Sequence, residues 1–316
     1  MITDAELIVD RRRLKRSLTL WRILALLALL AAIFGLVAWA GGFSQNKSWK
    51  DHIARVRIDG FISGDQATLN LFKSISEEPM VKAIIIRIDS PGGSTAGSEA
   101  LYEAIRAAAK DRPVVAVMDT VAASGGYITA IAADRVVARG NTITGSIGVI
   151  FQFPEISQLL ANLGIRMEEI KSGDMKAEPS PYKPVSDKAR AVSAAMVQDS
   201  FAWFTGLVAE RRKLPLERVK VLADGRVYTG RQALAEKLVD ELGGEEKAVG
   251  WLVGEKKLSA DLEVMDWTVP PLRDGGLFGF SAADMALRAV GLEGLAAEVE
   301  QRKLDGLLSL WHPAAN

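Results

Sequence analysis

The segment from residue 113 to residue 133 constrains this chain most, because it places one serine between a buried strand and a buried helix. The run Pro113-Val-Val-Ala-Val-Met118 is short, apolar and β-branched, which is typical of a buried strand. The run Tyr127-Ile-Thr-Ala-Ile-Ala-Ala133 contains small and apolar residues and predicts a buried helix. Ser124 is therefore expected at a helix N-terminus, beside unpaired N–H groups and the positive end of the helix dipole.

Two interpretations of Ser124 follow from this position. The hydroxyl could be a nucleophile, with the N–H of Gly125 stabilising an oxyanion. Alternatively, Ser124 could simply cap the helix, since serine is a favoured N-cap residue. The chain has no cysteine, which excludes thiolate catalysis and disulfides. Its two histidines, His52 and His312, lie outside the part of the sequence that we expect to be globular, so a lysine or a carboxylate is the expected base.

An uncharged apolar segment from residue 23 to residue 40 predicts a transmembrane anchor. As a helix it would span about 27 Å, close to the thickness of the hydrocarbon core. Basic residues precede it, so residues 1–22 are predicted to be a cytoplasmic tail and the rest of the chain to lie outside. A buried core helix is one alternative. A cleaved signal peptide is another, because Ala38-Trp39-Ala40 has the form of a cleavage site.

A short linker, residues 41–50, precedes a region in which strands and helices alternate, residues 51–270. This alternation predicts an α/β fold. Residues 271–316 are predicted to form a separate amphipathic segment.

Hydrophobic residues make up 49% of the chain and charged residues 25%, which predicts a packed core, and the net charge of +0 gives no reason to expect nucleic acid. We expect strands at 53–58, 81–89, 113–118, 136–139, 167–170 and 262–269, and helices at 65–78, 95–110, 155–163, 186–213, 230–239 and 244–255. The helix at 186–213 is expected to pack through an apolar stripe that contains Val192, Met196, Trp203 and Leu207.

Two further loops have compositions that could serve a site. Ser90-Pro-Gly-Gly93 follows a predicted buried strand, where a glycine pair can present backbone N–H groups, or can simply make a turn. It is not a P-loop, because no Gly-Lys-Ser/Thr follows. In the second loop, Thr142 to Gly148, Ser146 is either a turn residue or a hydrogen-bond partner for a buried polar group.

Four motifs that occur in order resemble the signal peptide peptidase SppA (protease IV) family of bacterial membrane serine proteases. They are Asp89-Ser-Pro-Gly-Gly93, Ala123-Ser-Gly-Gly-Tyr127, Thr144-Gly-Ser-Ile-Gly148 and Lys171-Ser-Gly-Asp-Met-Lys176. The resemblance extends from about residue 51 to about residue 260 and matches the short, single-domain form. It implies a Clp protease/crotonase-like α/β fold with an N-terminal transmembrane helix. It also implies a single-pass protein of the bacterial inner membrane with a periplasmic catalytic domain.

The resemblance also implies roles for individual residues. Ser124 matches the nucleophile, Lys176 the general base and Ser146 the serine that orients this lysine. The N–H groups of Gly93 and Gly125 match the oxyanion hole. No metal or cofactor is implied. The expected partners are peptide substrates (signal peptides left after precursor cleavage), membrane lipid around residues 23–40, and other copies of the chain in a homo-oligomeric ring, an octamer, in which adjacent protomers contribute the serine and the lysine.

Chemistry sets one condition on a lysine base, and the sequence departs from the family at two places. A lysine accepts a proton only when neutral, so its free pKa of about 10.4 must fall by about three units through desolvation or a nearby cation. Lys171 could be that cation, or a solvated surface charge. Ile128 stands where the family has a second aromatic residue, and Ala177-Glu178 are less polar than the usual context.

Three alternative functions remain open from the sequence. A crotonase-like acyl-CoA enzyme would use a similar pair of N–H groups. A non-catalytic ring scaffold would keep the fold without the chemistry. A Ser/Lys protease could instead act on a membrane partner protein, such as a stomatin.

Overall fold

The computed structural model describes residues 18–31, 50–269 and 308–310, and the chain divides into two units, 1–49 and 50–316. In the first unit, residues 18–31 form a helix. Among the described residues, no helix is both long enough and apolar enough to cross a membrane. The rest of the predicted anchor, residues 32–40, lies outside the described residues, and so does most of the predicted amphipathic segment.

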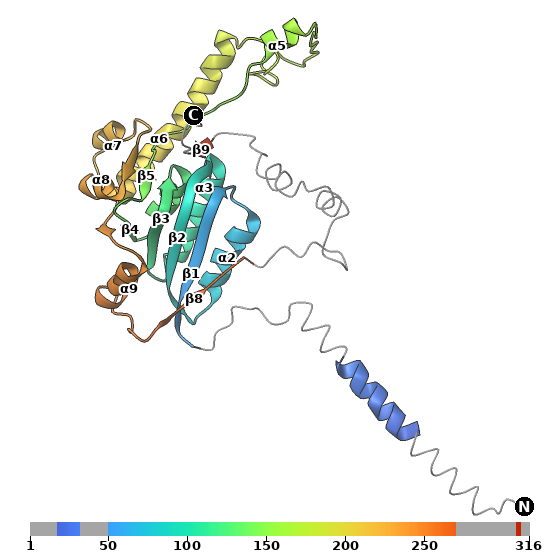
Figure 1. The fold of residues 1–316 in the computed structure, drawn as a ribbon, viewed down its shortest axis with the longest axis vertical. Coiled ribbons are helices and arrows are strands. Elements are labelled where there is room, and N and C mark those ends of the chain that lie inside the picture. Colours follow the sequence, from blue (N-terminus) through green and yellow to red (C-terminus); the bar gives the residue numbers. More distant parts are fainter. Residues whose placement is uncertain (1–17, 32–49, 270–307, 311–316) are drawn as a thin grey trace, which may run out of the picture. The chain divides into compact units, whose positions relative to one another are not determined.

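A mixed sheet forms the centre of the second unit (Figure 1). Its order is β6-β5-β3-β2-β1-β8, with β4 beside β3, β7 beside β4, and β9 beside β2. All pairs are parallel except β5–β6 and β2–β9. The strands are β1 (His52–Ile62), β2 (Val81–Ser94), β3 (Val114–Ala123), β4 (Arg135–Ala138), β5 (Ile143–Gly145), β6 (Val227–Thr229), β7 (Glu241–Leu242), β8 (Glu263–Asp266) and β9 (Leu308–Leu310).

Helices connect the parallel strands and cover both faces of the sheet, which confirms the predicted α/β class. The helices are α2 (Gln66–Glu77), α3 (Thr95–Ala108), α4 (Gly125–Ile131), α5 (Ser157–Asn162), α6 (Asp187–Arg212), α7 (Leu216–Leu222), α8 (Gly230–Ala235) and α9 (Glu245–Gly254). Side chains alternate along each strand, so one strand packs on helices from both sides. In β2, Ile84, Ile86 and Ile88 join the larger core with α2, α3 and α4, and Ala83 and Ile85 face α9 on the other side.

Most predicted elements are present, but several expectations are wrong. Residues 167–170 form no strand. The long helix α6 is present, but Val192 and Met196 of its expected apolar stripe are exposed, so its first half is not packed on the core. His52 is not outside the globular part: it is buried, and its Nε2 accepts a hydrogen bond from Trp267 Nε1 at 3.1 Å.

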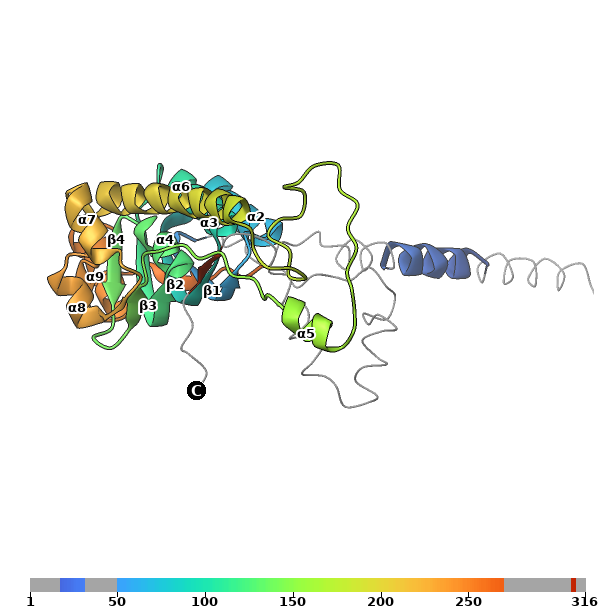
Figure 2. The same ribbon diagram turned by 90° about the horizontal axis from the view of Figure 1, so that it is seen from above.

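The segment from residue 149 to residue 186 leaves the sheet after β5 and returns to the start of α6. We call it the arm. Figures 1 and 2 show the arm, with α5 at its far end, projecting past the N-terminal half of α6. No residue of α5 is buried, and Leu159, Leu163 and Ile165 are all exposed. The arm therefore carries apolar side chains that the described part of the chain does not cover.

Candidate active site

Ser124 occupies a sharp turn between β3 and α4. Its backbone has φ 55° and ψ −114°, a conformation that is costly for a residue with a Cβ atom. Its N–H donates to the carbonyl of Gly145 at 2.8 Å, and its own carbonyl accepts from the N–H of Ile128 at 3.0 Å. The side chain makes no capping hydrogen bond to α4, so the interpretation of Ser124 as an ordinary helix cap is not supported. A strained strand-to-helix turn of this kind is how α/β hydrolases present a nucleophilic serine.

Ser146 lies beside Ser124 because β3 and β5 are parallel neighbours. Ala123 is paired with Gly145, so the next residue of each strand is a serine. Ser146 is also buried and also has a positive φ, 49°. Its N–H donates to the carbonyl of Arg226 at 2.9 Å. The fold thus brings these two predicted site residues together at the C-terminal ends of adjacent strands.

Gly93 and Gly125 come from the two segments that flank Ser124. Gly93 lies near the end of β2, where a Cβ atom would be 1.9 Å from the carbonyl oxygen of Ile62, so no other residue fits without moving β1. A Cβ atom at Gly126 would lie 2.6 Å from the carbonyl oxygen of Ser90. Residues 90–93, which were predicted to form a loop, belong to β2, and we call them the glycine loop. They pack directly against the first turn of α4, which brings the glycine loop and the serine turn into contact.

Hydrogen bonds inside the glycine loop and below α4 fix these two segments. The hydroxyl of Ser90 donates to the carbonyl of Gly60 at 2.6 Å and accepts from the N–H of Gly92 at 3.1 Å. Tyr127 is fully buried, and its hydroxyl donates to the carbonyl of Leu238 at 2.9 Å. Burial also raises the pKa of Tyr127, which keeps this phenol protonated as a donor.

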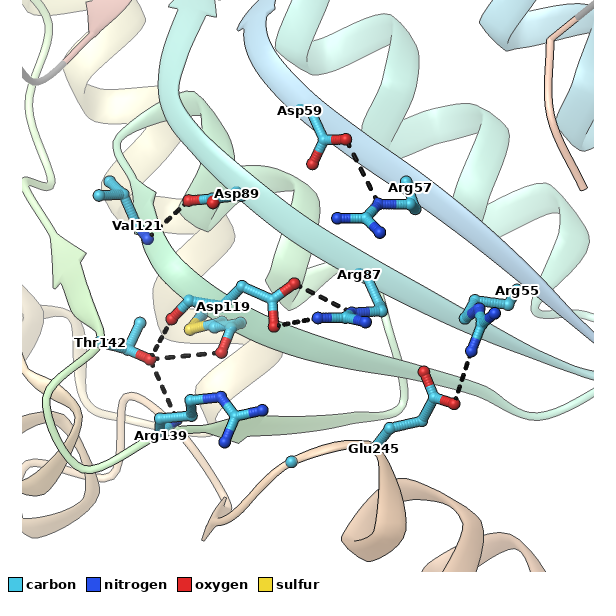
Figure 3. A network of polar contacts seen from close by, with 12 residues as sticks. Arg55, Arg57, Asp59, Arg87, Asp89, Asp119, Val121, Arg139, Thr142 and Glu245 are labelled. Carbon is cyan, nitrogen blue, oxygen red and sulfur yellow. Dashed lines mark hydrogen bonds and ion pairs between the residues drawn. The ribbon is translucent and has the colours of Figure 1, made fainter. Parts of the chain in front are cut away.

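A charged network lies on the face of the sheet that packs on α9, nearer to the C-terminal ends of the strands (Figure 3). Arg87 binds both carboxylate oxygens of Asp119, at 3.0 and 2.7 Å, and these hydrogen bonds raise the pKa of Arg87. Asp89 accepts from the N–H of Val121 at 3.0 Å, and the hydroxyl of Thr142 donates to the carbonyl of Asp119 at 2.6 Å. These bonds tie β2, β3 and the turn before β5 together, three to five residues before Ser124 along β3.

Lys176, the predicted base, lies on the arm and is exposed. Within the described part of the chain, its amine forms no hydrogen bond and no ion pair. One copy of the chain therefore assembles Ser124, Ser146, Gly93 and Gly125 but does not bring Lys176 to Ser124.

Lys171 is held by two carboxylates. Its amine lies 2.8 Å from both Glu169 and Glu178, and Lys183 binds the same two carboxylates at 3.1 and 2.5 Å. Hydrogen bonds from Lys171 and then Lys183 lower the pKa of Glu178 to about 2. The cluster of Glu169, Lys171, Glu178 and Lys183 fastens the base of the loop that carries Lys176.

Residues 308–310 were missed by the sequence interpretation, which placed them in an amphipathic segment. They form β9, which pairs antiparallel with Gly92–Ser94 of β2. The available signal was the uncharged run Leu307-Leu-Ser-Leu-Trp311, but so short an apolar run does not distinguish a strand from a helix.

Known proteins share sequence with the part of the chain that contains this site. A model of the family described as Peptidase family S49 matches residues 106–259. A putative protease of Synechocystis is 36% identical over 71% of this chain and 81% of its own length. A putative signal peptide peptidase SppA of Enterococcus faecium is 34% identical over 76% of this chain and 68% of its own length. Among solved structures, a ClpP1 mutant of Listeria monocytogenes is 18% identical, with a TM-score of 0.40 over 60% of this chain and 91% of that one.

Proposed function

The chain belongs to peptidase family S49 and is a serine peptidase, and from this premise we propose that Ser124 is its nucleophile and Lys176 of a neighbouring copy its base. One observation supports the choice of Ser124 above all. It occupies a strained turn, with φ 55°, between the glycine loop and the end of β5. The side chain of Ser124 makes no capping hydrogen bond to α4, so helix capping does not account for this costly backbone conformation.

The proposed reaction begins with attack of the Ser124 oxygen on the peptide carbonyl. Neutral Lys176 takes the hydroxyl proton, and the N–H groups of Gly93 and Gly125 stabilise the oxyanion. The C–N bond then breaks, and the lysine returns the proton to the leaving amine. Water deprotonated by the same lysine hydrolyses the acyl-enzyme and regenerates Ser124. Ser146, next to Ser124, is proposed to orient the lysine by a hydrogen bond.

The exposed arm supports the proposal that the lysine comes from another copy. A cavity of about 340 Å³ lies between the start of the arm and α6, and its lining includes Val149, Phe151, Phe153 and Val197. The arm also carries the exposed apolar side chains Leu159, Leu163 and Ile165. A second copy seated on the arm would cover them and would desolvate Lys176, and desolvation favours the neutral amine that can accept a proton. We propose a closed ring of such contacts, an octamer as the family resemblance implies, because head-to-tail contacts form rings when the rotation between neighbouring copies closes.

We further propose that the substrates are cleaved signal peptides and that residues 23–40 are a membrane anchor. The apolar composition of this segment and the relative described as a putative signal peptide peptidase support this proposal. The catalytic unit would then stand on the periplasmic side of a bacterial inner membrane, since the basic residues precede the anchor.

The experiment compares the purified full-length chain with Ser124→Ala and Lys176→Ala in a casein or signal-peptide assay. Each variant is expected to lose activity by at least about a thousandfold while keeping its circular dichroism spectrum. Lys188→Ala is the matched control, because Lys188 is exposed and lies close in sequence but has no proposed role. Full activity of Lys176→Ala would contradict the proposed base.

Mixing the two inactive variants tests whether neighbouring copies share a site. If serine and lysine come from different copies, random reassembly restores both groups in about a quarter of the sites. The expected recovery is therefore about a quarter of the wild-type activity. If each chain contributes both groups to its own site, mixing restores nothing.

A further inference from the structure

Four neighbouring strands change from apolar to charged on the face of the sheet that packs on α9. In β2, Ala83 and Ile85 pack on α9, and Arg87 and Asp89 follow on the same face. The same change occurs in β1, in β3 and at the end of β4, where the apolar residues are followed by Arg57, Asp119 and Arg139. A hollow of about 420 Å³ lies over this charged part, towards the carboxyl ends of the strands. Ligands of α/β sheets bind outside the carboxyl ends of parallel strands.

The two aspartates that line the hollow already have partners. Both carboxylate oxygens of Asp119 accept hydrogen bonds from Arg87, at 3.0 and 2.7 Å. Asp89 accepts a hydrogen bond from the N–H of Val121 at 3.0 Å. These carboxylates therefore hold β2 and β3 together, and they leave little negative charge to balance any further cation in the hollow.

Arg139 is such a cation. Within the part of the chain that the structure describes, its guanidinium forms no hydrogen bond and no ion pair. Its backbone is fixed, because its N–H donates to the hydroxyl of Thr142 at 3.0 Å and its carbonyl accepts from the N–H of Thr142 at 3.1 Å. Backbone N–H groups of Glu246 and Gly244 chiefly lower the pKa of Glu246, and Arg139 adds a smaller effect without forming an ion pair. The fold thus holds an uncompensated guanidinium at the rim of the hollow.

Two further residues of the hollow can donate to a ligand. The side-chain oxygen of Asn141 accepts from Arg231 at 2.6 Å, which leaves the NH₂ group of this amide as a donor. Arg57 lies 3.4 Å from Asp59, but both side chains are more than half exposed, and exposed pairs of this kind contribute little to stability. An incoming anion can therefore compete with Asp59 for Arg57.

We propose that this hollow binds a small molecule through an oxyanion group, a phosphate or a carboxylate, with Arg139 as the main contact and Asn141 and Arg57 as further donors. The planar fork of a guanidinium matches two oxygens of either group. The volume of the hollow suits a small molecule. The site is separate from the proposed peptidase site, because α4, which follows Ser124, packs in the core on the other face of the sheet.

Isothermal titration calorimetry of the purified full-length chain tests the site. Sodium phosphate and sodium acetate are titrated separately, with sodium chloride holding the ionic strength constant. Saturable binding of one anion per chain is expected, and Arg139→Gln should weaken it by at least about tenfold, because a hydrogen-bonded charge is lost. Lys110→Gln is the charge-matched control, since Lys110 is exposed and lies outside the hollow. Absence of saturable binding, or equal affinity of wild type and Arg139→Gln, would refute the site.

Chemical modification tests the same contact without a substitution. Phenylglyoxal reacts with exposed guanidinium groups, and mass spectrometry locates the modified arginines. The anion that binds should slow modification of Arg139 but not that of Arg218, which is half exposed on α7. Equal rates at Arg139 with and without the anion would show that the anion binds elsewhere.

The source of the oxyanion is distinguished by two further ligands. Glycerol phosphate carries the group on a soluble molecule, and dihexanoylphosphatidylglycerol carries it on a lipid headgroup. Tighter binding of the first would identify a soluble phosphate ester, tighter binding of the second a lipid headgroup, and binding of acetate alone a carboxylate. Each of these affinities must fall in Arg139→Gln. The titrations can be repeated with Ser124→Ala, so an inactive peptidase that binds the anion would keep this site, and an active one that does not would refute this site alone.

Discussion

Ser124 and Ser146 show how much of the site is encoded residue by residue. Both follow the last paired residue of adjacent strands, and both have positive φ angles. The sequence predicts Ser124, Ser146, Gly93 and Gly125, because strand ends and glycine loops leave a local signature. Their proximity is not a local property and depends on the pairing of β3 with β5. Lys176 could be found only by resemblance, because nothing around it in one chain distinguishes it from other exposed lysines.

The strain at Ser124 predicts that glycine at this position gives a more stable protein than alanine does. Ser124→Gly and Ser124→Ala both remove the hydroxyl, so both should be inactive. Only glycine accepts φ 55° and ψ −114° without steric cost. Chemical denaturation should give Ser124→Gly a free energy of unfolding about 1 kcal/mol above that of Ser124→Ala. Equal stability of the two variants would show that the turn is not strained.

Close packing at Gly126 predicts the opposite sign for an added methyl group. A Cβ atom there would lie 2.6 Å from the carbonyl oxygen of Ser90, so Gly126→Ala should push the glycine loop away from α4. The expected cost is about 1–3 kcal/mol, with loss of peptidase activity. Gly206→Ala in α6 is the matched control, because its Cβ would meet nothing within 4 Å. That variant should be more stable than wild type by up to about 1 kcal/mol.

At the scale of elements, long apolar runs predicted the sheet well, and short mixed segments did not. The core strands β2 and β3 are nearly continuous apolar runs, so their positions were predictable. Met167-Glu-Glu-Ile170 was also predicted to be a strand, yet it lies on the arm, where Glu169 binds Lys171 and Lys183 and no strand pairs with it. The short strands β6 and β9 were not foreseen, because a three-residue strand is defined by its neighbour and not by its own sequence.

The carboxylate cluster predicts that the arm loosens in acid. The folded pKa of Glu178 is about 2, well below its ordinary value, so its ionised form stabilises the arm at neutral pH. That contribution is complete above the unfolded pKa of about 4.3 and is lost as pH falls towards 2. Limited proteolysis by pepsin should cut within the arm increasingly fast between about pH 4.5 and pH 2.

Glu178→Gln is the control for this acid response. The variant lacks the titrating carboxylate, so its arm should already be more susceptible at neutral pH, measured with a neutral protease. Its cleavage by pepsin should then depend less steeply on pH than that of the wild type. An identical pH profile for the two proteins would show that Glu178 does not fasten the arm.

At the scale of the whole molecule, the uncovered arm predicts self-association. Leu163 and Ile165 are exposed by 65% and 48%, and we expect a second copy to bury them. Leu163→Asp with Ile165→Asp should lower the mass measured by light scattering in detergent from that of an oligomer towards that of one chain. The same variant should lose peptidase activity, because Lys176 then has no neighbouring Ser124.

Val221→Asp provides the comparison for this experiment, since Val221 is 64% exposed on α7, outside the arm. It should leave both mass and activity unchanged. An arm variant that remains fully assembled would show that the copies meet elsewhere. The sequence could not reveal such contacts, because exposed and subunit-covered apolar residues form the same patterns along a chain.

The buried pair His52 and Trp267 lies at the opposite end of the sheet from the serine turn. β1 starts at His52 and comes level with the serine near Phe61, because Phe61 is opposite Gly92, and Ser90, two residues before Gly92, is opposite Ala122, two residues before Ser124. Nine strand residues at about 3.3 Å each separate these levels by about 30 Å. A peptide held level with residue 50 would therefore need about nine extended residues of its own to reach Ser124 before any bond in it can be cut.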